Sequence, residues 1–238
     1  MRGVSGIRAT GDDAVQPTSP LEGIQAVPRS TADARRWYDQ LSPWYDLLVD
    51  PFESTGRETG VTQLSPQRGD LVLDIGCGTG SALVDLAEAV GPAGSAIGID
   101  LSAAMCRRTQ QRIADQALRQ TAVVHGDARS LPFADDSFDA AFASFVLELF
   151  DTSDLVPVAQ EWRRILKSDG SLVVVALSRR STGPAVRAYE WFHHRFPTRL
   201  DCRPIHVTNT LRMSGFNLDD RIEQSIAGLP IDIVRVRP

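Results

Sequence analysis

An acidic residue followed by three alternating glycines is the part of the chain with the clearest chemical meaning. Asp74 precedes Gly76, Gly78 and Gly80. Glycine has no Cβ atom, so its backbone can turn sharply and approach a ligand closely. The apolar residues before this loop fit a short buried strand, and Ser81 after it is a candidate N-cap for a helix. A strand, a glycine loop and a helix in this order form the first half of a nucleotide-binding βαβ unit.

The charge of the acid separates the two ligand classes that use such a unit. A dinucleotide-binding loop spaces its glycines G-x-G-x-x-G and places an anionic pyrophosphate at the helix N-terminus. Here the spacing is G-x-G-x-G, and Asp74 would repel a diphosphate. A carboxylate suits instead a ligand that carries positive charge and no phosphate. S-adenosylmethionine is such a ligand, because its methionine half carries an ammonium and a sulfonium group.

The loop resembles the first motif of the class I S-adenosylmethionine-dependent methyltransferases. The match runs over residues 73–80, Leu-Asp-Ile-Gly-Cys-Gly-Thr-Gly, and includes Cys77. The resemblance implies that Asp74, Cys77 and the three glycines bind the cofactor.

A second acid lies where this family contacts the ribose. Asp100 ends the apolar run 95–99, 20 residues beyond Gly80. An acid at this place can accept hydrogen bonds from both ribose hydroxyls. NAD-dependent enzymes place an acid similarly, so Asp100 alone does not separate the two classes. Leu101 and Met105 follow, and we expect them to pack on the adenine.

Three later segments also resemble family motifs, in the expected order. A third predicted strand, 121–124, leads to Asp127 and Ala128, which match the acid and small residue that read the adenine edge. Residues 131–139 resemble the L-P-F…D-x-x-F-D segment before strand four, and residues 161–170 resemble the helix-to-turn segment before strand five at Leu172. Ordered, spaced matches identify the family more specifically than a glycine loop alone.

The segment after strand four resembles the ubiquinone/menaquinone C-methyltransferases but departs from them at two positions. Those enzymes carry S-F-G-L-R-N, and residues 144–149 read S-F-V-L-E-L. The resemblance implies a cofactor contact for Ser144. Glu148 and Leu149 replace the Arg-Asn pair that handles the hydroxyl next to the methylated carbon, and a carboxylate cannot replace a cationic bidentate donor. Glu148 is then a base, a site for a cationic amine, or a loop carboxylate with no role.

The chemistry itself requires few groups from the protein. Methyl transfer from a sulfonium is an in-line displacement, so alignment and exclusion of water supply much of the acceleration. An oxygen or carbon nucleophile also needs a general base near the methyl group. The candidate bases are Glu148, His193, His194 and His206. Adjacent histidines on a helix point in different directions, so at most one of the pair faces the site, and a surface position is the alternative for each.

Residues 37–46 gather aromatic side chains ahead of the core. They resemble the Y-D-x-x-S-x-x-Y-D segment of the same C-methyltransferases, in which an N-terminal helix pair lies over the cofactor. The resemblance implies that Tyr45 reaches the methionine end of the cofactor; the alternative is that these aromatics only pack a helix onto the sheet. Arg35 and Arg36 beside Trp37 leave a transient membrane contact open.

The fold that positions these groups is predicted to be α/β. We expect a Rossmann-like, doubly wound seven-stranded sheet, mostly parallel with an antiparallel C-terminal strand, plus an N-terminal helical lid. Two alternating segments at 217–226 and 230–236 fit the closing hairpin, and 206–214 and 183–196 read as helices. The expected parts are a disordered leader at 1–29, the lid at 30–66, and a cofactor-binding domain at 67–238 with an insertion near 181–214.

Composition agrees with an ordinary globular enzyme. The 238 residues leave room for one α/β domain with a buried core and additions. The net charge of −5 argues against a nucleic-acid substrate. No apolar run approaches the ~20 residues that span a bilayer, and no signal-peptide core is present. The three scattered cysteines show no metal-ligand spacing, so we expect no metal and a reducing cytoplasm.

Three functional hypotheses follow. The leading one is a methyltransferase for a small, apolar or aromatic acceptor, in which C- or O-methylation of a quinone-like ring competes with N-methylation of an amine or phospholipid headgroup. An NAD-dependent oxidoreductase is disfavoured by Asp74 and by the glycine spacing. A non-catalytic domain that keeps the cofactor pocket is the third. The sequence favours no particular oligomeric state.

Overall fold

A computed structural model gives the arrangement of the chain. It describes residues 31–42, 45, 50–179 and 202–238. The predicted leader at 1–29 and the predicted helix at 183–196, with His193 and His194, lie outside these residues. Of the insertion predicted near 181–214, the structure describes the part from 202 onward.

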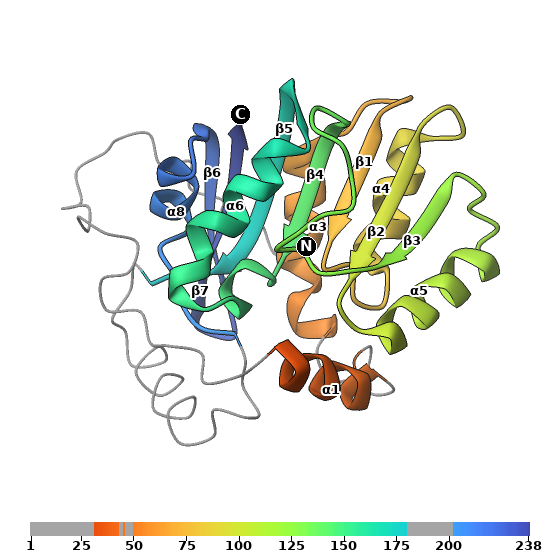
Figure 1. Cartoon of the computed structure of the whole chain (residues 1–238), viewed down its shortest axis with the longest axis horizontal. Helices are drawn as coiled ribbons and strands as arrows, with labels where there is room; N and C mark the ends of the chain where they lie inside the picture. Colours follow the sequence, from red (N-terminus) through yellow and green to blue (C-terminus); the bar gives the residue numbers. More distant parts are fainter. Residues whose placement is uncertain (1–30, 43–44, 46–49, 180–201) are drawn as a thin grey trace, which may run out of the picture.

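A seven-stranded sheet forms the centre of the molecule (Figure 1). Its strands are β1 (Leu71–Ile75), β2 (Ser95–Asp100), β3 (Thr121–His125), β4 (Phe138–Ser144), β5 (Leu166–Leu177), β6 (Asn217–Ile226) and β7 (Leu229–Arg237). The order across the sheet is β3-β2-β1-β4-β5-β7-β6. The first five strands pair in parallel, and β7 pairs antiparallel with both β5 and β6. The predicted mostly parallel sheet with an antiparallel C-terminal strand is confirmed.

The order of the strands reverses at β1. The chain adds β2 and β3 on one side of β1 and then returns to add β4 on the other side. The loops that leave β1 and β4 therefore diverge, which opens a crevice beyond the carboxyl ends of these strands. Ligands of open α/β sheets bind in such a crevice.

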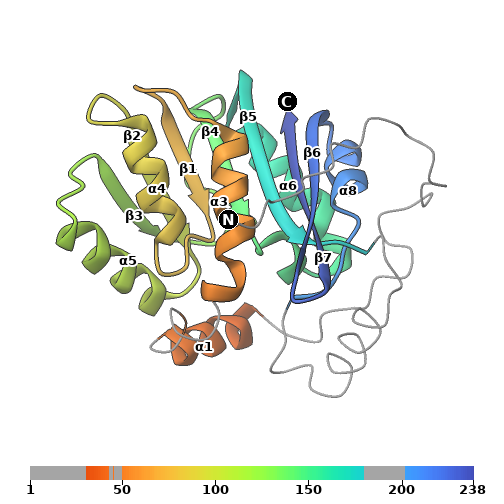
Figure 2. The same ribbon diagram turned by 180° about the vertical axis from the view of Figure 1, so that it is seen from behind.

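Helices cover both faces of the sheet (Figures 1 and 2). The helices are α1 (Thr31–Leu41), α3 (Asp50–Leu64), α4 (Ser81–Val90), α5 (Ala103–Asp115), α6 (Leu155–Arg164) and α8 (Val207–Met213), with short 3₁₀ turns η2 (Leu147–Leu149) and η3 (Thr152–Asp154). One face is packed by α3, α4 and α5, and the other by α6 and α8. The fold is therefore doubly wound. Helix α1 lies at the lower edge of the sheet in Figure 1, beside α5. Among the described helices, none is long and apolar enough to cross a membrane.

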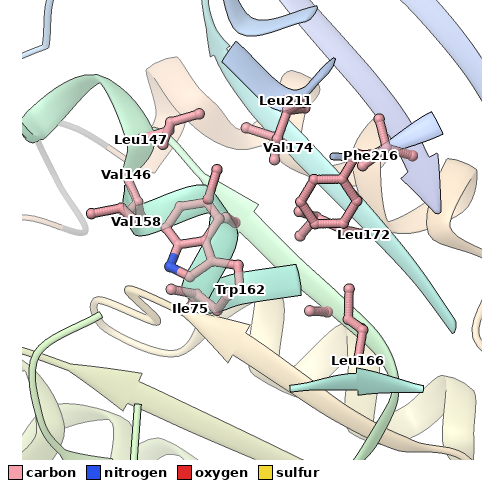
Figure 3. Close-up of a cluster of buried hydrophobic side chains, with 14 of the residues drawn as sticks. Ile75, Val146, Leu147, Val158, Trp162, Leu166, Leu172, Val174, Leu211 and Phe216 are labelled. Atoms are coloured by element: carbon pink, nitrogen blue, oxygen red, sulfur yellow. The ribbon is translucent and has the colours of Figure 1, made fainter. Parts of the chain in front are cut away.

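The core under α6 and α8 reaches the loop that follows β3 (Figure 3). Trp162 of α6 is fully buried among Ile75, Val158 and Val174. Its indole Nε1 donates a hydrogen bond to the carbonyl oxygen of Ala128 at 3.0 Å. The largest side chain of this core thus fixes the backbone of a loop on which the sequence predicts a cofactor contact.

The predicted N-cap of α4 is wrong. The N-cap residue is Gly80, whose φ of 87° places it in the left-handed region, and no side chain caps the helix. Ser81 is already the first helical residue, and its Oγ accepts a hydrogen bond from Arg112 Nη1 of α5 at 2.5 Å. The left-handed turn at the end of the glycine loop leads directly into the helix, so no extended residue lies between them to serve as a side-chain cap.

Strand β5 begins earlier than predicted. Its first residue is Leu166, which is buried and pairs with Phe138 of β4. The register then shifts, and Ser171 pairs with Ala140. The polar residues that predicted a turn before Leu172 therefore lie at an irregularity within the strand, because Leu166 joins the core before them.

The two ends of the segment 180–201 meet at the end of β5. Ser178 forms a parallel bridge with Ile205. The Ile205 amide donates to Leu177 at 3.0 Å, and the Arg179 amide donates to Ile205 at 3.2 Å. The chain therefore leaves the sheet and returns to it at one place.

Candidate active site

A cavity of about 170 Å³ lies at the carboxyl ends of the parallel strands. It is lined by Ala34, Tyr38, Tyr45, Gly76, Gly78, Ile99, Asp100, Leu101, Met105, Gly126, Asp127, Ala128, Arg129, Ser144, Phe145, Val146, Leu149, Phe150, Asp151 and Asp154. Most residues predicted to bind the cofactor are among them. We call the part formed by Asp100 to Met105 and Gly126 to Arg129 the β2–β3 side, and the part formed by Tyr45, Ser144 to Val146, Leu149 and Phe150 the β4 side.

The three glycines of the loop have different roles. All have positive φ, at 69° for Gly76, 55° for Gly78 and 87° for Gly80. A Cβ on Gly76 would lie 2.4 Å from Val146 Cγ2, and one on Gly80 would lie 2.6 Å from Thr109 Cγ2. A Cβ on Gly78 would meet no atom within 4 Å. Packing therefore requires the outer two glycines, whereas Gly78 faces open space beside the cavity where a ligand can approach its backbone.

Asp100 braces this loop from the end of β2. Its Oδ2 accepts a hydrogen bond from the Gly78 amide at 2.9 Å, and its Oδ1 accepts one from the Ser102 amide at 2.8 Å. Burial raises the pKa of Asp100 to about 6, although these amide hydrogen bonds oppose the shift. Each carboxylate oxygen has a second lone pair, so Asp100 can still accept hydrogen bonds from a ligand hydroxyl.

Asp74, Cys77 and Gly80 do not line the cavity. Asp74 is 2% exposed, and its Oδ2 has no hydrogen-bond partner within the described part of the chain. Burial, reinforced by the charge of Asp100, raises the pKa of Asp74 to about 8. The Sγ of Cys77 packs close to Gly98 of β2, and burial raises the pKa of its thiol. Asp74 therefore lies beneath the loop and not at the cavity wall, and a cation bound nearby would favour its charged form.

Arg129 forms an ion pair with the carboxylate of Asp127 on the β2–β3 side. Its Nη2 donates to Asp127 Oδ2 at 2.6 Å, and its backbone amide donates to Oδ1 at 3.0 Å. Burial opposes ionisation of Asp127, but the hydrogen bonds from Arg129 prevail and lower its pKa. The sequence reasoning missed Arg129, because no motif marks the second residue after the acid.

Helix α1 is attached to this side through Asp39. Asp39 Oδ1 accepts hydrogen bonds from Ser102 Oγ at 2.5 Å and from the Ala104 amide at 3.2 Å. Ser102 is the N-cap of α5, and its Oγ accepts from the Met105 amide at 3.1 Å. The hydrogen bond from Ser102 is the main cause that lowers the pKa of Asp39. One carboxylate therefore joins the N-terminal helix to the residues that follow Asp100.

Tyr45 comes from the segment that precedes the sheet, and it lines the β4 side of the cavity. Its phenol donates a hydrogen bond to Glu53 Oε2 of α3 at 3.0 Å. Burial, together with the neighbouring Glu53 charge, raises the pKa of Tyr45 well above its usual value. The sequence reasoning named Tyr45 but missed Glu53, which lies outside the aromatic segment.

Of the candidate bases named from the sequence, Glu148 and His206 do not line the cavity. Glu148 is fully buried, because the η2 turn directs Leu149 to the cavity and Glu148 to the interior. Its Oε1 accepts a hydrogen bond from the Leu177 amide at 3.2 Å, and burial raises its pKa to about 8. His206 is the N-cap residue of α8. His193 and His194 lie outside the described residues. Within the described residues, no group of three or more His, Cys, Asp or Glu is placed to hold a metal.

Comparison with known proteins shows which family this chain is similar to. A family model described as a methyltransferase domain matches residues 72–170. The demethylmenaquinone methyltransferase of Halalkalibacterium halodurans is 33% identical over 211 residues, which cover 84% of this chain and 85% of that protein. That of Geobacillus sp. (strain WCH70) is 33% identical over 140 residues, which cover 59% of this chain and 58% of that protein. The structure of magnesium protoporphyrin IX methyltransferase from Synechocystis PCC 6803 with bound SAH matches with a TM-score of 0.69 at 18% identity, covering 88% of this chain and all of that one.

The residues around the cavity fit the cofactor of this family. Gly78 leaves room for close approach to the backbone, and Asp100 and Asp127 present carboxylates along one side. Bound S-adenosylmethionine would supply an electrophilic methyl group there. The predicted family, enzyme class and cofactor are confirmed, and the NAD-dependent and non-catalytic alternatives are set aside. The chain belongs to the class I S-adenosylmethionine-dependent methyltransferases.

Proposed function

We propose that this methyltransferase acts on a small aromatic acceptor with a ring hydroxyl, of the quinol type, and methylates it on a ring carbon or on the oxygen. The observation that carries the proposal is the lining of the β4 side. Tyr45, Phe145, Val146, Leu149 and Phe150 surround the cavity there. Apolar and aromatic walls, with the phenols of Tyr45 and Tyr38 also lining the cavity, suit an aromatic ring, because aromatic pairs gain stability beyond the area that they bury. The names of the relatives in Halalkalibacterium and Geobacillus agree with a quinone-like acceptor.

The cofactor is proposed to lie along the loop with its adenosine on the β2–β3 side. Asp100 would accept from the ribose hydroxyls, and Asp127 with the Ala128 amide would read the adenine edge, with Leu101 and Met105 against the ring. The methionine half would then extend past Gly76 and Gly78 toward Ser144 and Tyr45. This orientation directs the methyl group to the β4 side, where the acceptor is proposed to bind.

The replacement of Arg-Asn by Glu-Leu changes how the acceptor is held. Leu149 lines the cavity, whereas Glu148 turns away from it to bind the Leu177 amide. The β4 side of this enzyme is therefore more apolar than the S-F-G-L-R-N pattern implies. A ring hydroxyl needs a different polar partner here, and Tyr45 is the residue in place.

The direct test is methyl transfer to a defined probe. The full-length protein is incubated with isotopically labelled S-adenosylmethionine and 1,4-naphthohydroquinone kept reduced, and the product is examined by mass spectrometry. We expect a labelled methyl group on the naphthalene ring or its oxygen. Cofactor binding measured by calorimetry without labelled product from this probe would reject the quinol-type acceptor but retain the enzyme class.

One observation supports N-methylation as a second candidate. Asp151 and Asp154 line the cavity just beyond Phe150, and Asp154 is only 3.9 Å from Arg129. Carboxylates at a cavity rim can attract a cationic amine. The same assay with phosphatidylethanolamine vesicles in place of the quinol separates the two, because labelled phospholipid would favour the amine.

A further inference from the structure

A phenol and a carboxylate are paired at the wall of the β4 side. Tyr45 lines the cavity, and its hydroxyl donates to Glu53 Oε2 at 3.0 Å. Glu53 belongs to α3, one turn before Gly56, where a Cβ would lie 2.9 Å from Ile231 Cδ1 and 3.3 Å from Val175 Cγ1, near the carboxyl end of β5. The pair therefore stands beyond the ends of β4 and β5, on the side of the cavity away from Asp100 and Asp127.

Two carboxyl groups near this wall of the cavity differ in their burial. Glu148, the other carboxyl group nearby, is fully buried, and burial raises its pKa to about 8, with a contribution from Glu53. At neutral pH Glu148 is therefore mostly protonated. Glu53, by contrast, is only half-buried.

Tyr45 alone is a poor base, because its buried phenol keeps its proton. A phenol can nevertheless accept a proton with its oxygen while it releases its own proton to a partner. The hydrogen bond to Glu53 provides that partner. Tyr45 lines the cavity and Glu53 does not, so Tyr45 is the member of the pair that is open to a molecule bound there.

We propose that Tyr45 is a catalytic residue and that Glu53 acts through it, the two together accepting the proton of an ionisable aromatic hydroxyl on the methyl acceptor. This inference rests on the proposed function and narrows it to acceptors with such a hydroxyl. It assigns the role predicted for Glu148 to a different carboxylate.

The proton and electron balance is simple. The acceptor hydroxyl gives its proton to Tyr45 Oη as the Tyr45 proton moves to Glu53. The carbon–sulfur bond of the methyl donor breaks with its electron pair on sulfur, and the ring supplies the pair that forms the new oxygen–carbon or carbon–carbon bond. If a ring carbon is methylated, that carbon loses its hydrogen and the hydroxyl is restored. In both cases one proton is released overall, and Glu53 passes it to solvent.

The test compares Glu53→Gln, Glu53→Asp and Tyr45→Phe with wild type. Glutamine keeps an acceptor for the Tyr45 hydrogen bond but takes up no proton. With 1,4-naphthohydroquinone as the probe, we expect Glu53→Gln and Tyr45→Phe to lower kcat by about 100-fold, within the range for general-base catalysis. The KM for the probe and the Kd for S-adenosylmethionine should stay within about threefold. Glu53→Asp should recover part of the rate, and the double variant should lose no more than either single variant.

Glu58→Gln is the matched control, because Glu58 is exposed on the same helix. It should behave as wild type in melting temperature and in turnover. If Glu53→Gln fails to fold, Tyr45→Phe and Glu53→Asp carry the comparison.

The outcomes separate this inference from the proposed function. A kcat of Glu53→Gln within twofold of wild type, or a loss confined to cofactor affinity, overturns the proton relay. Wild-type enzyme that binds S-adenosylmethionine but does not methylate the probe overturns the acceptor class named here. Absence of cofactor binding in wild type instead refutes the methyltransferase function itself.

Discussion

On the β2–β3 side of the cavity, the carboxylates that line it follow directly from strand ends, whereas the β4 side combines Tyr45, which precedes the sheet in sequence, with residues that follow β4. Asp100 ends β2 and Asp127 follows β3 by two residues. On the β4 side, Tyr45 is held by Glu53 of α3, and Leu149 follows β4. Because the sheet holds the end of a strand, it also fixes the backbone position of the residues that follow directly. Tyr45 and Glu53 lie only eight positions apart, but they come beside the residues that follow β4 because α3 packs against β4 and β5.

The largest effect is expected at the centre of the glycine loop. Gly78→Val should weaken S-adenosylmethionine binding by at least about 100-fold, or about 2.7 kcal/mol, because the new side chain fills the space beside the cavity. The matched control is Gly69→Val, since Gly69 also has positive φ, at 96°, with no atom within 4 Å of a Cβ. Calorimetry and thermal unfolding on both variants separate the lost contact from backbone strain. Equal losses of affinity in the two variants would show that strain alone is responsible.

The attachment of α1 to the β2–β3 side should have the next largest effect. Asp39→Ala removes the acceptor of the Ser102 and Ala104 hydrogen bonds, and we expect cofactor affinity to fall about tenfold, or about 1.4 kcal/mol. Asp33→Ala is the control on the same helix, because Asp33 pairs with Arg36 on its exposed surface. Calorimetry checks the prediction. An unchanged Kd for Asp39→Ala would show that α1 does not contribute to the cofactor site.

Glu148 provides a pH-dependent test of the β4 side. Its pKa is raised from 4.5 to about 8 in the folded state, so the folded chain keeps a proton that the unfolded chain loses above its ordinary pKa. Stability should therefore fall as pH rises from 5 to 8. Asp74 and Asp100 contribute in the same direction, so Glu148→Gln removes only the share of Glu148. The variant should be more stable than wild type by about 1 kcal/mol or more at pH 8, with a smaller difference at pH 5. Urea unfolding at the two pH values measures it.

If the difference in unfolding free energy between Glu148→Gln and wild type is the same at pH 5 and at pH 8, Glu148 is not protonated in the folded state. If Glu148→Gln loses much of its turnover while its cofactor affinity is unchanged, Glu148 takes part in the reaction and is not separated from the cavity.

The smallest effect is expected from Arg129. Its pair with Asp127 is partly exposed, and such ion pairs contribute about 0–1 kcal/mol. Arg129→Ala should change the Kd for S-adenosylmethionine by less than about fivefold, since 1 kcal/mol corresponds to roughly that factor. Asp127→Ala, measured by the same calorimetry, should cost more. If Arg129→Ala costs more than Asp127→Ala, Arg129 rather than the acid is the main contact on this side.

The sequence predicted the β2–β3 side well for a physical reason. Buried parallel strands are short apolar runs, and the residue that ends each run is carried to the same edge of the sheet. Asp100 and Asp127 could therefore be placed beside the cavity without knowing any side-chain contact. The direction of a side chain in a short turn is less constrained by sequence. Glu148 and Leu149 are neighbours, yet the first turns inward and the second faces the cavity.

Apart from the local pair of Arg129 and Asp127, the contacts that the sequence did not predict depend on tertiary packing. Asp39 binds Ser102 across 63 positions of the chain, and Trp162 binds Ala128 across 34. Glu53 becomes a candidate only when α3 is packed against β4 and β5. None of these pairs has a spacing pattern, because tertiary packing and not local periodicity brings the partners together.

The bridge between Ser178 and Ile205 has a consequence for how the sheet tolerates changes in chain length. Ser178 pairs directly with Ile205, and Leu177 and Arg179 share backbone hydrogen bonds with Ile205, so these contacts hold the end of β5. Doubling the length of a loop costs only about 0.6 kcal/mol in closure entropy. A change in the number of residues between Arg179 and Cys202 is therefore compatible with the same register of β5 against β7.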